Sequence, residues 1–285
     1  MHRTRVLTVA LLVAASAAMP SDPSNGGSET VIVHNGPVTL HALLWHPQGR
    51  GPFPAILLNH GSGRTREQLG RLGPYEGQAE ILGPVFARHG YAFLFLFRQG
   101  VGLSAGQGTS AIDLMDSELA AHGQHARNVL QLRLLENREL SDAAAGLAFL
   151  RRLLEVDPHR VAIVGHSFGG SLTILLAAQE SNLRAAVVFS AAGYSWDRSP
   201  ELREKLLSAV GHVQTPIFFI HAANDYSIHS GQALDARLEQ LGKPHQLKIY
   251  PAIGSTSDDG HNFPLVGVNI WEPDVFAFLG KQMQR

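Results

Sequence analysis

A serine between two glycines is the residue of this sequence whose surroundings most strongly favour chemistry. Ser167 lies in Gly165-His166-Ser167-Phe168-Gly169, after the apolar, β-branched residues 161–164 and before an Ala- and Leu-rich stretch over 171–178. This order of strand, sharp turn and helix exposes a hydroxyl at the end of a sheet, and the glycines leave room for the turn. The helix start behind Ser167 directs N–H groups at developing negative charge. We therefore predict that Ser167 is a nucleophile.

A second Gly-x-Ser-x-Gly, around Ser104, provides an internal comparison. Ser104 lies well beyond the strand predicted over residues 91–97, and Gly106 and Gly108 follow where a helix would have to begin. It therefore lacks the strand–turn–helix context of Ser167. We expect Ser104 to be an ordinary loop residue.

A serine hydroxyl needs a base to take its proton and an acid to orient that base. Asp225 follows the strand predicted over residues 216–221, and His261 follows the strand predicted over 246–250. Because the carboxyl ends of parallel strands meet at one edge of a sheet, both should lie near Ser167. Two alternatives stay open: Asp225 caps a helix while Asp258 or Asp259 is the acid, or His261 is an ordinary surface histidine.

The elements that must position these side chains alternate between strand and helix. Strands are predicted over residues 29–35, 38–45, 55–59, 91–97, 161–164, 184–190, 216–221 and 246–250. Helices are predicted over residues 79–89, 112–138 with a break near Gly123, 141–155 with a cap at Ser141-Asp142, 171–178, 231–241 and 273–283. The pattern predicts an α/β fold: a mainly parallel, doubly wound sheet with helices on both faces and an antiparallel N-terminal hairpin.

Length and composition are those of one globular domain. The 285 residues are 45% hydrophobic and 16% charged, which suits a single α/β domain over residues 29–285 with a small lid-like insertion at about 193–212. The net charge of -1 and the absence of cysteine argue against a nucleic-acid surface and exclude disulfides. Neither composition nor pattern predicts an oligomeric state.

The first 18 residues have the pattern of a secretory signal peptide. Residues 2–5 are basic, 6–14 are apolar, and 15–18 are small, with cleavage expected near Ala17-Ala18. The apolar run is short for a membrane span, so we predict an exported mature chain with no integral span. A polar linker over residues 19–28 follows, and an uncleaved anchor is the alternative.

Five segments together resemble the α/β-hydrolases, in particular the dienelactone hydrolase-like and prolyl-oligopeptidase-like branch. They are residues 58–63, 98–104, 164–170, 221–225 and 260–263. The resemblance implies the α/β-hydrolase fold, a triad of Ser167, Asp225 and His261, and an oxyanion hole formed by the backbone N–H groups of Ser62 and Phe168. The sequence departs from that branch in three ways: it has no cysteine nucleophile, Tyr226-Ser227-Ile228-His229 replaces the usual Val-Pro, and residues 255–259 lengthen the approach to the histidine.

The predicted activity is acyl transfer to water, with a small-molecule ester or a short peptide-like compound as substrate. A serine aminopeptidase or amidase with the same triad is the alternative enzyme, and a non-catalytic binding protein is the alternative class. No phosphate loop or dinucleotide motif occurs in the right context, and His122 and His125 lack a third metal ligand, so neither cofactor nor metal is predicted. The pocket should be lined by residues 64–78, 99–111 and 193–212, and the short insertion suggests an open site.

Overall fold

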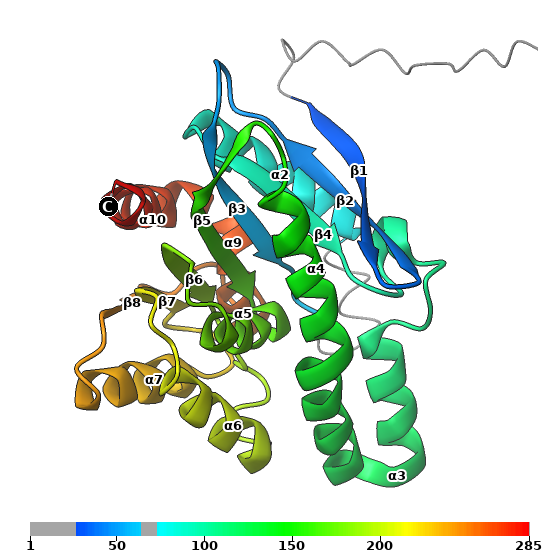
Figure 1. Ribbon diagram of the computed structural model, residues 1–285. Coiled ribbons are helices and arrows are strands. Elements are labelled where there is room, and N and C mark those ends of the chain that lie inside the picture. The colour runs from blue at the N-terminus through cyan, green and yellow to red at the C-terminus, as the bar shows by residue number, and fades with distance from the viewer. Residues whose placement is uncertain (1–26, 64–72, 285) are drawn as a thin grey trace, which may run out of the picture.

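A single eight-stranded sheet runs through the described part of the chain, residues 27–63 and 73–284 of the computed structural model. The strand order is β1-β2-β4-β3-β5-β6-β7-β8 (Figure 1). The strands are β1 (Ser28–Asn35), β2 (Val38–Trp45), β3 (Phe53–Asn59), β4 (Ala92–Phe97), β5 (Val156–His166), β6 (Ala185–Phe189), β7 (Ile217–Ala222) and β8 (His245–Tyr250). The predicted signal peptide and nearly all of the predicted linker lie outside the described residues.

The sheet is parallel except at its N-terminal edge. β1 and β2 form an antiparallel hairpin that pairs with β4, whereas β4, β3, β5, β6, β7 and β8 run parallel to one another. The inner parallel strands are largely apolar and buried because helices cover both faces of the sheet, whereas β8 at the edge is only partly buried. The predicted fold class, including the hairpin, is confirmed.

Helices lie on both faces of the sheet, and the sheet separates the core into two layers (Figure 1). α2 (Tyr75–Arg88) and α10 (Val268–Met283) pack on one face, where Ile56 and Leu58 point. The other face, where Leu57 points, is covered by α3 (Ala111–Leu134), α4 (Leu140–Leu150), α5 (Phe168–Gln179), α6 (Pro200–Val210) and α7 (His229–Gln240). Short helices α8 (Ser257–His261) and α9 (Phe263–Val266) follow β8. None of the described helices is long and apolar enough to span a bilayer.

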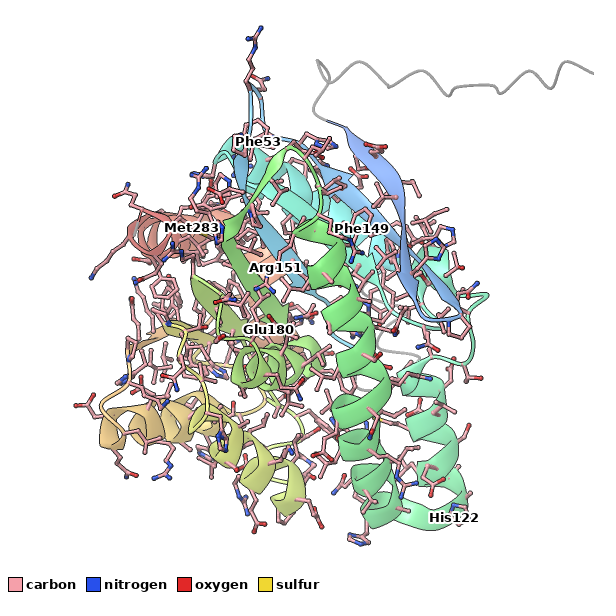
Figure 2. All side chains as sticks on the ribbon, viewed as in Figure 1. Phe53, His122, Phe149, Arg151, Glu180 and Met283 are labelled. Atoms are coloured by element: carbon pink, nitrogen blue, oxygen red, sulfur yellow. The ribbon has the colours of Figure 1, made fainter. Side chains whose placement is uncertain are left out.

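The chain reverses direction at the predicted break. Gly123 has φ 83° and ψ -177°, which is not helical, so the segment labelled α3 is an antiparallel helical hairpin. His122 marks its tip in Figure 2. The returning arm continues through a π-helical turn, η3 (Leu135–Glu139), directly into α4.

Several helix boundaries differ from the predicted ones; α2, for example, begins at Tyr75 and not at residue 79. Ser141 and Asp142 do not cap a new helix, because the helix runs through them and their side chains bind Asn35 in the β1–β2 turn instead. α10 begins at Val268, five residues before the predicted start, so Pro273 lies inside the helix and leaves one carbonyl of the preceding turn without its helical hydrogen bond.

A glycine allows α2 to approach the sheet closely. A Cβ atom at Gly83 would lie 2.2 Å from the indole ring of Trp45, which is fully buried. A Cβ at Gly77 in the same helix would have only one neighbour within 4 Å, at 3.9 Å. The two glycines therefore differ in what they do: Gly83 makes room for a core side chain, whereas Gly77 is not required by packing.

We expect Gly83→Ala to lower the free energy of unfolding by about 1–3 kcal/mol, because Trp45 must shift within a packed core. Gly77→Ala is the matched control and should be neutral or stabilising by up to about 1 kcal/mol, since alanine is the better helix former. Urea unfolding of both variants measures the difference. Equal effects of the two substitutions would contradict the close approach of α2.

Candidate active site

Ser167 occupies a strained turn between β5 and α5. Its φ is 56° and its ψ is -117°, which is unusual for a residue with a side chain. The turn is held by the N–H of Ser167, which donates to Phe189 O at 2.9 Å. A Cβ at Gly165 would lie 2.3 Å from Gly169 O, and a Cβ at Gly169 would lie 2.0 Å from Asn59 O. Both flanking glycines are therefore required by close backbone contacts.

The structure brings the three predicted side chains together in one hydrogen-bonded chain. Ser167 Oγ lies 2.8 Å from Nε2 of His261, and Nδ1 of His261 lies 2.7 Å from Oδ1 of Asp225. His261 and Asp225 are 6% and 8% exposed. His261 is the last residue of α8, a short helix that follows β8. In this arrangement Nδ1–H donates to the carboxylate, which leaves Nε2 free to accept the serine proton.

The other two candidate acids have different partners. Asp259 accepts hydrogen bonds from Thr256 in a capping box at the start of α8. Asp258 accepts a hydrogen bond from the hydroxyl of Tyr226. Asp225 is the carboxylate bonded to the His261 ring.

Asp225 is the electrostatic centre of the site. Oδ1 also accepts the N–H of Tyr226 at 2.7 Å, and Oδ2 accepts Nδ1–H of His221 at 2.8 Å. Burial alone would raise the pKa of the Asp225 carboxyl, but the charges and hydrogen bonds of His261 and His221 hold that pKa well below its usual range. The carboxylate therefore stays ionised at neutral pH.

Ser62 and Phe168 line the same pocket as Ser167 and His261. Ser62 follows β3 in the segment that crosses the start of α5, and Phe168 is the first residue of α5, where N–H groups have no partner within the helix. Residues 193–212 contribute Tyr194 and Ser195 to the wall. No described residue of the loop 99–111 lines this pocket.

The loop 99–111 lies along β2 instead. Its serine, Ser104, is fully buried and accepts a hydrogen bond from His41 N at 2.8 Å, and Gln107 accepts one from Thr39 N. The second Gly-x-Ser-x-Gly is thus part of the contact between this loop and the hairpin. Residues 64–72 lie outside the described residues.

Two residues of α3 line the pocket but are not among the site residues predicted from the sequence. Arg127 is only 4% exposed, and Gln131 exchanges two hydrogen bonds with Ser195, each 3.1 Å long. Burial lowers the pKa of Arg127, and the nearby Asp116 and Tyr194 act in the opposite direction. An arginine at one of the buried positions of an amphipathic helix is the sequence signal that could have identified Arg127. The chain reversal at Gly123 brings this arm of α3 over the site, and that contact could not be predicted from the sequence.

The two histidines considered as metal ligands lie on the exposed hairpin tip. His122 contacts Glu118 and His125 contacts Glu201. Across residues 27–63 and 73–284, no three His, Cys, Asp or Glu side chains are grouped so that they could hold a metal ion.

A doubly wound sheet with a serine in a strained turn between strand and helix is the architecture of the α/β-hydrolase fold. Within that fold class, the chain belongs to the dienelactone hydrolase family, whose family model matches residues 81–262, more than half of the sequence.

Solved structures share the fold at low sequence identity. A putative dienelactone hydrolase from Klebsiella pneumoniae superposes with a TM-score of 0.63 at 17% identity, over 89% of this chain and 98% of that one. An esterase from Pyrococcus furiosus gives 0.62 at 16% identity, over 95% and 96%. An acylaminoacyl peptidase from Pyrococcus horikoshii gives 0.59 at 18% identity, over 90% of this chain and 41% of that one.

Curated relatives are matched over only part of their length. Quorum-quenching protein AidA of Acinetobacter baumannii is 29% identical over 150 residues, which are 53% of this chain and 39% of that protein. The uncharacterized peptidase YuxL of Bacillus subtilis is 25% identical over 259 residues, 79% of this chain and 35% of that protein. The matched region therefore spans well under half of each relative.

His166, next to Ser167, is a half-buried neutral histidine. Its Nε2–H donates to His261 O at 2.7 Å, and burial, together with the nearby His261, lowers the pKa of His166 to about 3. In the unfolded chain the same group takes up a proton below about pH 6.5. Because the unfolded state binds this proton first, His166 makes the fold less stable as the pH falls from about 6.5 towards 3.

We expect His166→Asn, which keeps a donor near His261 O, to weaken the acid dependence of stability. Between pH 6 and pH 4, the free energy of unfolding should fall less steeply in the variant, by about 1.4 kcal/mol per pH unit at most. Urea titrations at several pH values measure the slopes. Above pH 8 the slopes of wild type and variant should coincide, because His166 is then neutral in both states. Identical slopes between pH 6 and pH 4 would contradict a neutral His166 in the folded protein.

Proposed function

We propose that this protein is a serine hydrolase that cleaves carboxylic esters through an acyl-enzyme. The observation that carries the proposal is the continuous hydrogen-bonded chain from Ser167 through His261 to the ionised Asp225. That geometry is what a serine needs to act as a nucleophile at neutral pH. Membership of the dienelactone hydrolase family supports the same class of reaction.

In the proposed mechanism, Nε2 of His261 takes the proton of Ser167 as Oγ attacks the ester carbonyl carbon. Asp225 stabilises the imidazolium that forms. The N–H groups of Phe168 and Ser62 bind the carbonyl oxygen as it becomes negative, and such donors are typically each worth about 3 kcal/mol. His261 then gives its proton to the leaving alcohol, and water repeats the sequence to release the acid.

The charges around the pocket favour an ester over an aminopeptidase substrate. A free α-amino group is cationic and calls for an acidic partner, yet none of the described residues that line the pocket is acidic. Arg127 is a buried cation in that wall, and Asp225 is occupied by two histidines. The pocket is thus suited to a substrate that is neutral or carries a carboxylate near the scissile bond.

The basic, apolar and small-residue segments at the N-terminus support a further part of the proposal. We infer that the enzyme acts outside the cytoplasm after cleavage near Ala17-Ala18. N-terminal sequencing of the protein recovered from its natural host would test this, and recovery of Met1 in the mature protein would contradict it.

Ser167→Ala should abolish hydrolysis of a p-nitrophenyl ester, with kcat falling by about 10⁴-fold or more because no nucleophile remains. Ser104→Ala, at the other Gly-x-Ser-x-Gly, is the control and should retain wild-type turnover. A fluorophosphonate probe should label wild type and Ser104→Ala but not Ser167→Ala. Near-normal turnover by Ser167→Ala would contradict the mechanism, and a wild type that neither turns over nor takes the label would favour a non-catalytic binding protein.

Arg127→Met should lower the preference for an anionic substrate. The pair to compare is a p-nitrophenyl ester whose acyl chain ends in a carboxylate and its neutral carboxamide isostere. We expect the ratio of kcat/KM values to fall by about tenfold, since a charge-assisted hydrogen bond is lost. Arg127→Lys, which retains the charge, should keep most of the preference. A ratio that is equal in wild type and Arg127→Met would show that Arg127 does not contact the substrate.

A further inference from the structure

Buried side chains hold two successive carbonyl groups of the segment between β3 and Ser62. Gly61 O accepts a hydrogen bond from the hydroxyl of Tyr75 at 3.2 Å and another from Nδ1–H of His60 at 2.7 Å. His60 O accepts one from Nη2 of Arg98 at 2.9 Å. The orientation of two consecutive peptide groups is thus set by side chains that do not line the pocket containing Ser167.

The orientation of the Gly61 carbonyl determines where the next N–H points. Gly61 C=O and Ser62 N–H belong to one trans peptide group, so they point in opposite directions. The oxygen is directed towards Tyr75 and His60 in the interior. The N–H of Ser62 therefore points away from them, and Ser62 itself lines the pocket that also contains Ser167.

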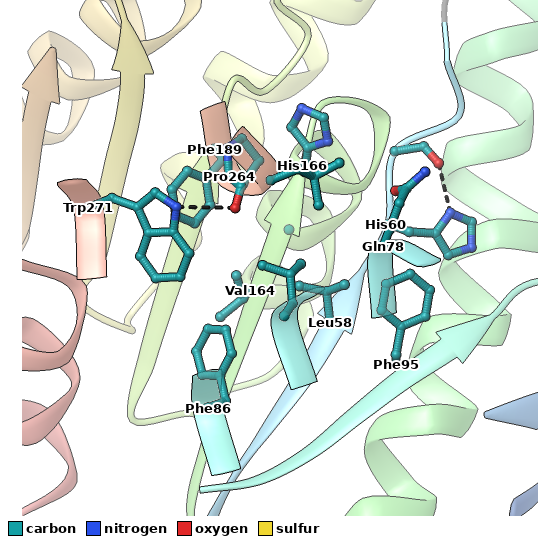
Figure 3. A pocket seen from close by; sticks show the side chains of 14 residues that line it. Leu58, His60, Gln78, Phe86, Phe95, Val164, His166, Phe189, Pro264 and Trp271 are labelled. Atoms are coloured by element: carbon teal, nitrogen blue, oxygen red, sulfur yellow. Dashed lines mark hydrogen bonds between the residues drawn. The ribbon is translucent and has the colours of Figure 1, made fainter. Parts of the chain in front are cut away.

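The partners of Gly61 O are themselves fixed. Tyr75 is the first residue of α2 and is 6% exposed, with its ring centroid 4.5 Å from that of His60. The His60 ring stacks on Phe95 at 5.8 Å, beside the apolar cavity shown in Figure 3. Burial raises the pKa of the Tyr75 hydroxyl, so it remains protonated and a donor at neutral pH.

Arg98 fixes the tautomer of His60 as well as its carbonyl. The N–H of Arg98 donates to Nε2 of His60 at 3.4 Å, which leaves the ring proton on Nδ1, where it donates to Gly61 O. Nε of Arg98 in turn donates to Oε2 of Glu139 at 2.6 Å, and both residues of this ion pair are 2% exposed. Tyr75, His60 and Arg98 therefore form one network behind the loop.

We propose that Tyr75 is a positioning residue of the oxyanion hole: its hydroxyl, bonded to Gly61 O, keeps the N–H of Ser62 aimed at the oxyanion that forms on a substrate bound to Ser167. This inference rests on the proposed serine mechanism. Tyr75 does not touch the substrate. Tyr75 helps to stabilise the transition state and not the bound substrate, because the oxyanion develops only in the transition state.

The test is Tyr75→Phe, which removes one oxygen atom from a buried ring. Tyr250→Phe is the matched control, since Tyr250 is also a buried residue, but its hydroxyl donates to Asp274 on α10 at 2.5 Å. With a p-nitrophenyl ester, we expect kcat of Tyr75→Phe to fall by about 10- to 100-fold with KM within about twofold of wild type. Tyr250→Phe should leave kcat unchanged.

A second measurement separates positioning from general loosening of the fold. A trifluoromethyl ketone adds to Ser167: Oγ bonds to the carbonyl carbon, the hydroxyl proton passes to His261, and the ketone oxygen becomes an oxyanion in the same place. Its affinity should fall by the same factor as kcat in Tyr75→Phe and stay unchanged in Tyr250→Phe. Thermal unfolding should shift similarly in the two variants, because each loses one buried hydrogen bond.

The other possible outcomes distinguish a failure of the positioning role from a failure of the proposed function. An unchanged kcat in Tyr75→Phe, an equal loss in Tyr250→Phe, or a higher KM at constant kcat would overturn the positioning role while leaving the serine mechanism intact. Absence of Ser167-dependent turnover in the wild type would instead overturn the proposed function, and this inference with it.

Discussion

The contact between Gly169 and the end of β3 is the constraint on which the site depends. A Cβ at Gly169 would lie 2.0 Å from Asn59 O and 2.4 Å from His60 O, so α5 and β3 can approach this closely only with glycine there. Asn59 also donates to Thr173 Oγ1 in α5 at 2.9 Å. As a result, the turn that carries Ser167 and the segment that leads to Ser62 have a fixed separation, and that separation sets the distance between the proposed nucleophile and the proposed N–H donor.

The charges of the site are arranged around two buried carboxylates with separate partners. Asp225 serves His261 and His221, while Glu139 is paired with Arg98 and, through Oε1, with Arg138. Each carboxylate has its own hydrogen-bond donors, so neither is an unpaired charge in the interior. One network therefore orients His261, the proposed base, and the other orients the segment that leads to Ser62, and a change in one need not disturb the other.

The parts that could be predicted from sequence are those that backbone topology determines. Ser167, Asp225 and His261 each follow a strand, and the ends of parallel strands converge whatever the loops do, so their meeting could be expected. Arg127 and Tyr75 could not be assigned in this way. Their positions depend on how a helix packs over the sheet and on side-chain direction, which in the case of Arg127 follows a chain reversal at Gly123.

Contacts between distant segments also explain why the predicted helix cap at Ser141-Asp142 is wrong, and they define what the loop 99–111 does. The local sequence pattern favours a helix start there. In the structure, however, Asp142 is fully buried and accepts hydrogen bonds from Asn35 and from Gln99, and such distant partners cannot be predicted from the sequence of the helix alone. These bonds fasten the loop after β4 to α4 just where Arg98 leaves the sheet. Because Arg98 is fixed from both sides, by Glu139 in the π-helical turn and by its neighbour's bond to Asp142, its guanidinium can hold His60 O in place. The loop that contains the second Gly-x-Ser-x-Gly, around Ser104, thus helps to hold Arg98. Arg98 in turn holds the segment that leads to Ser62.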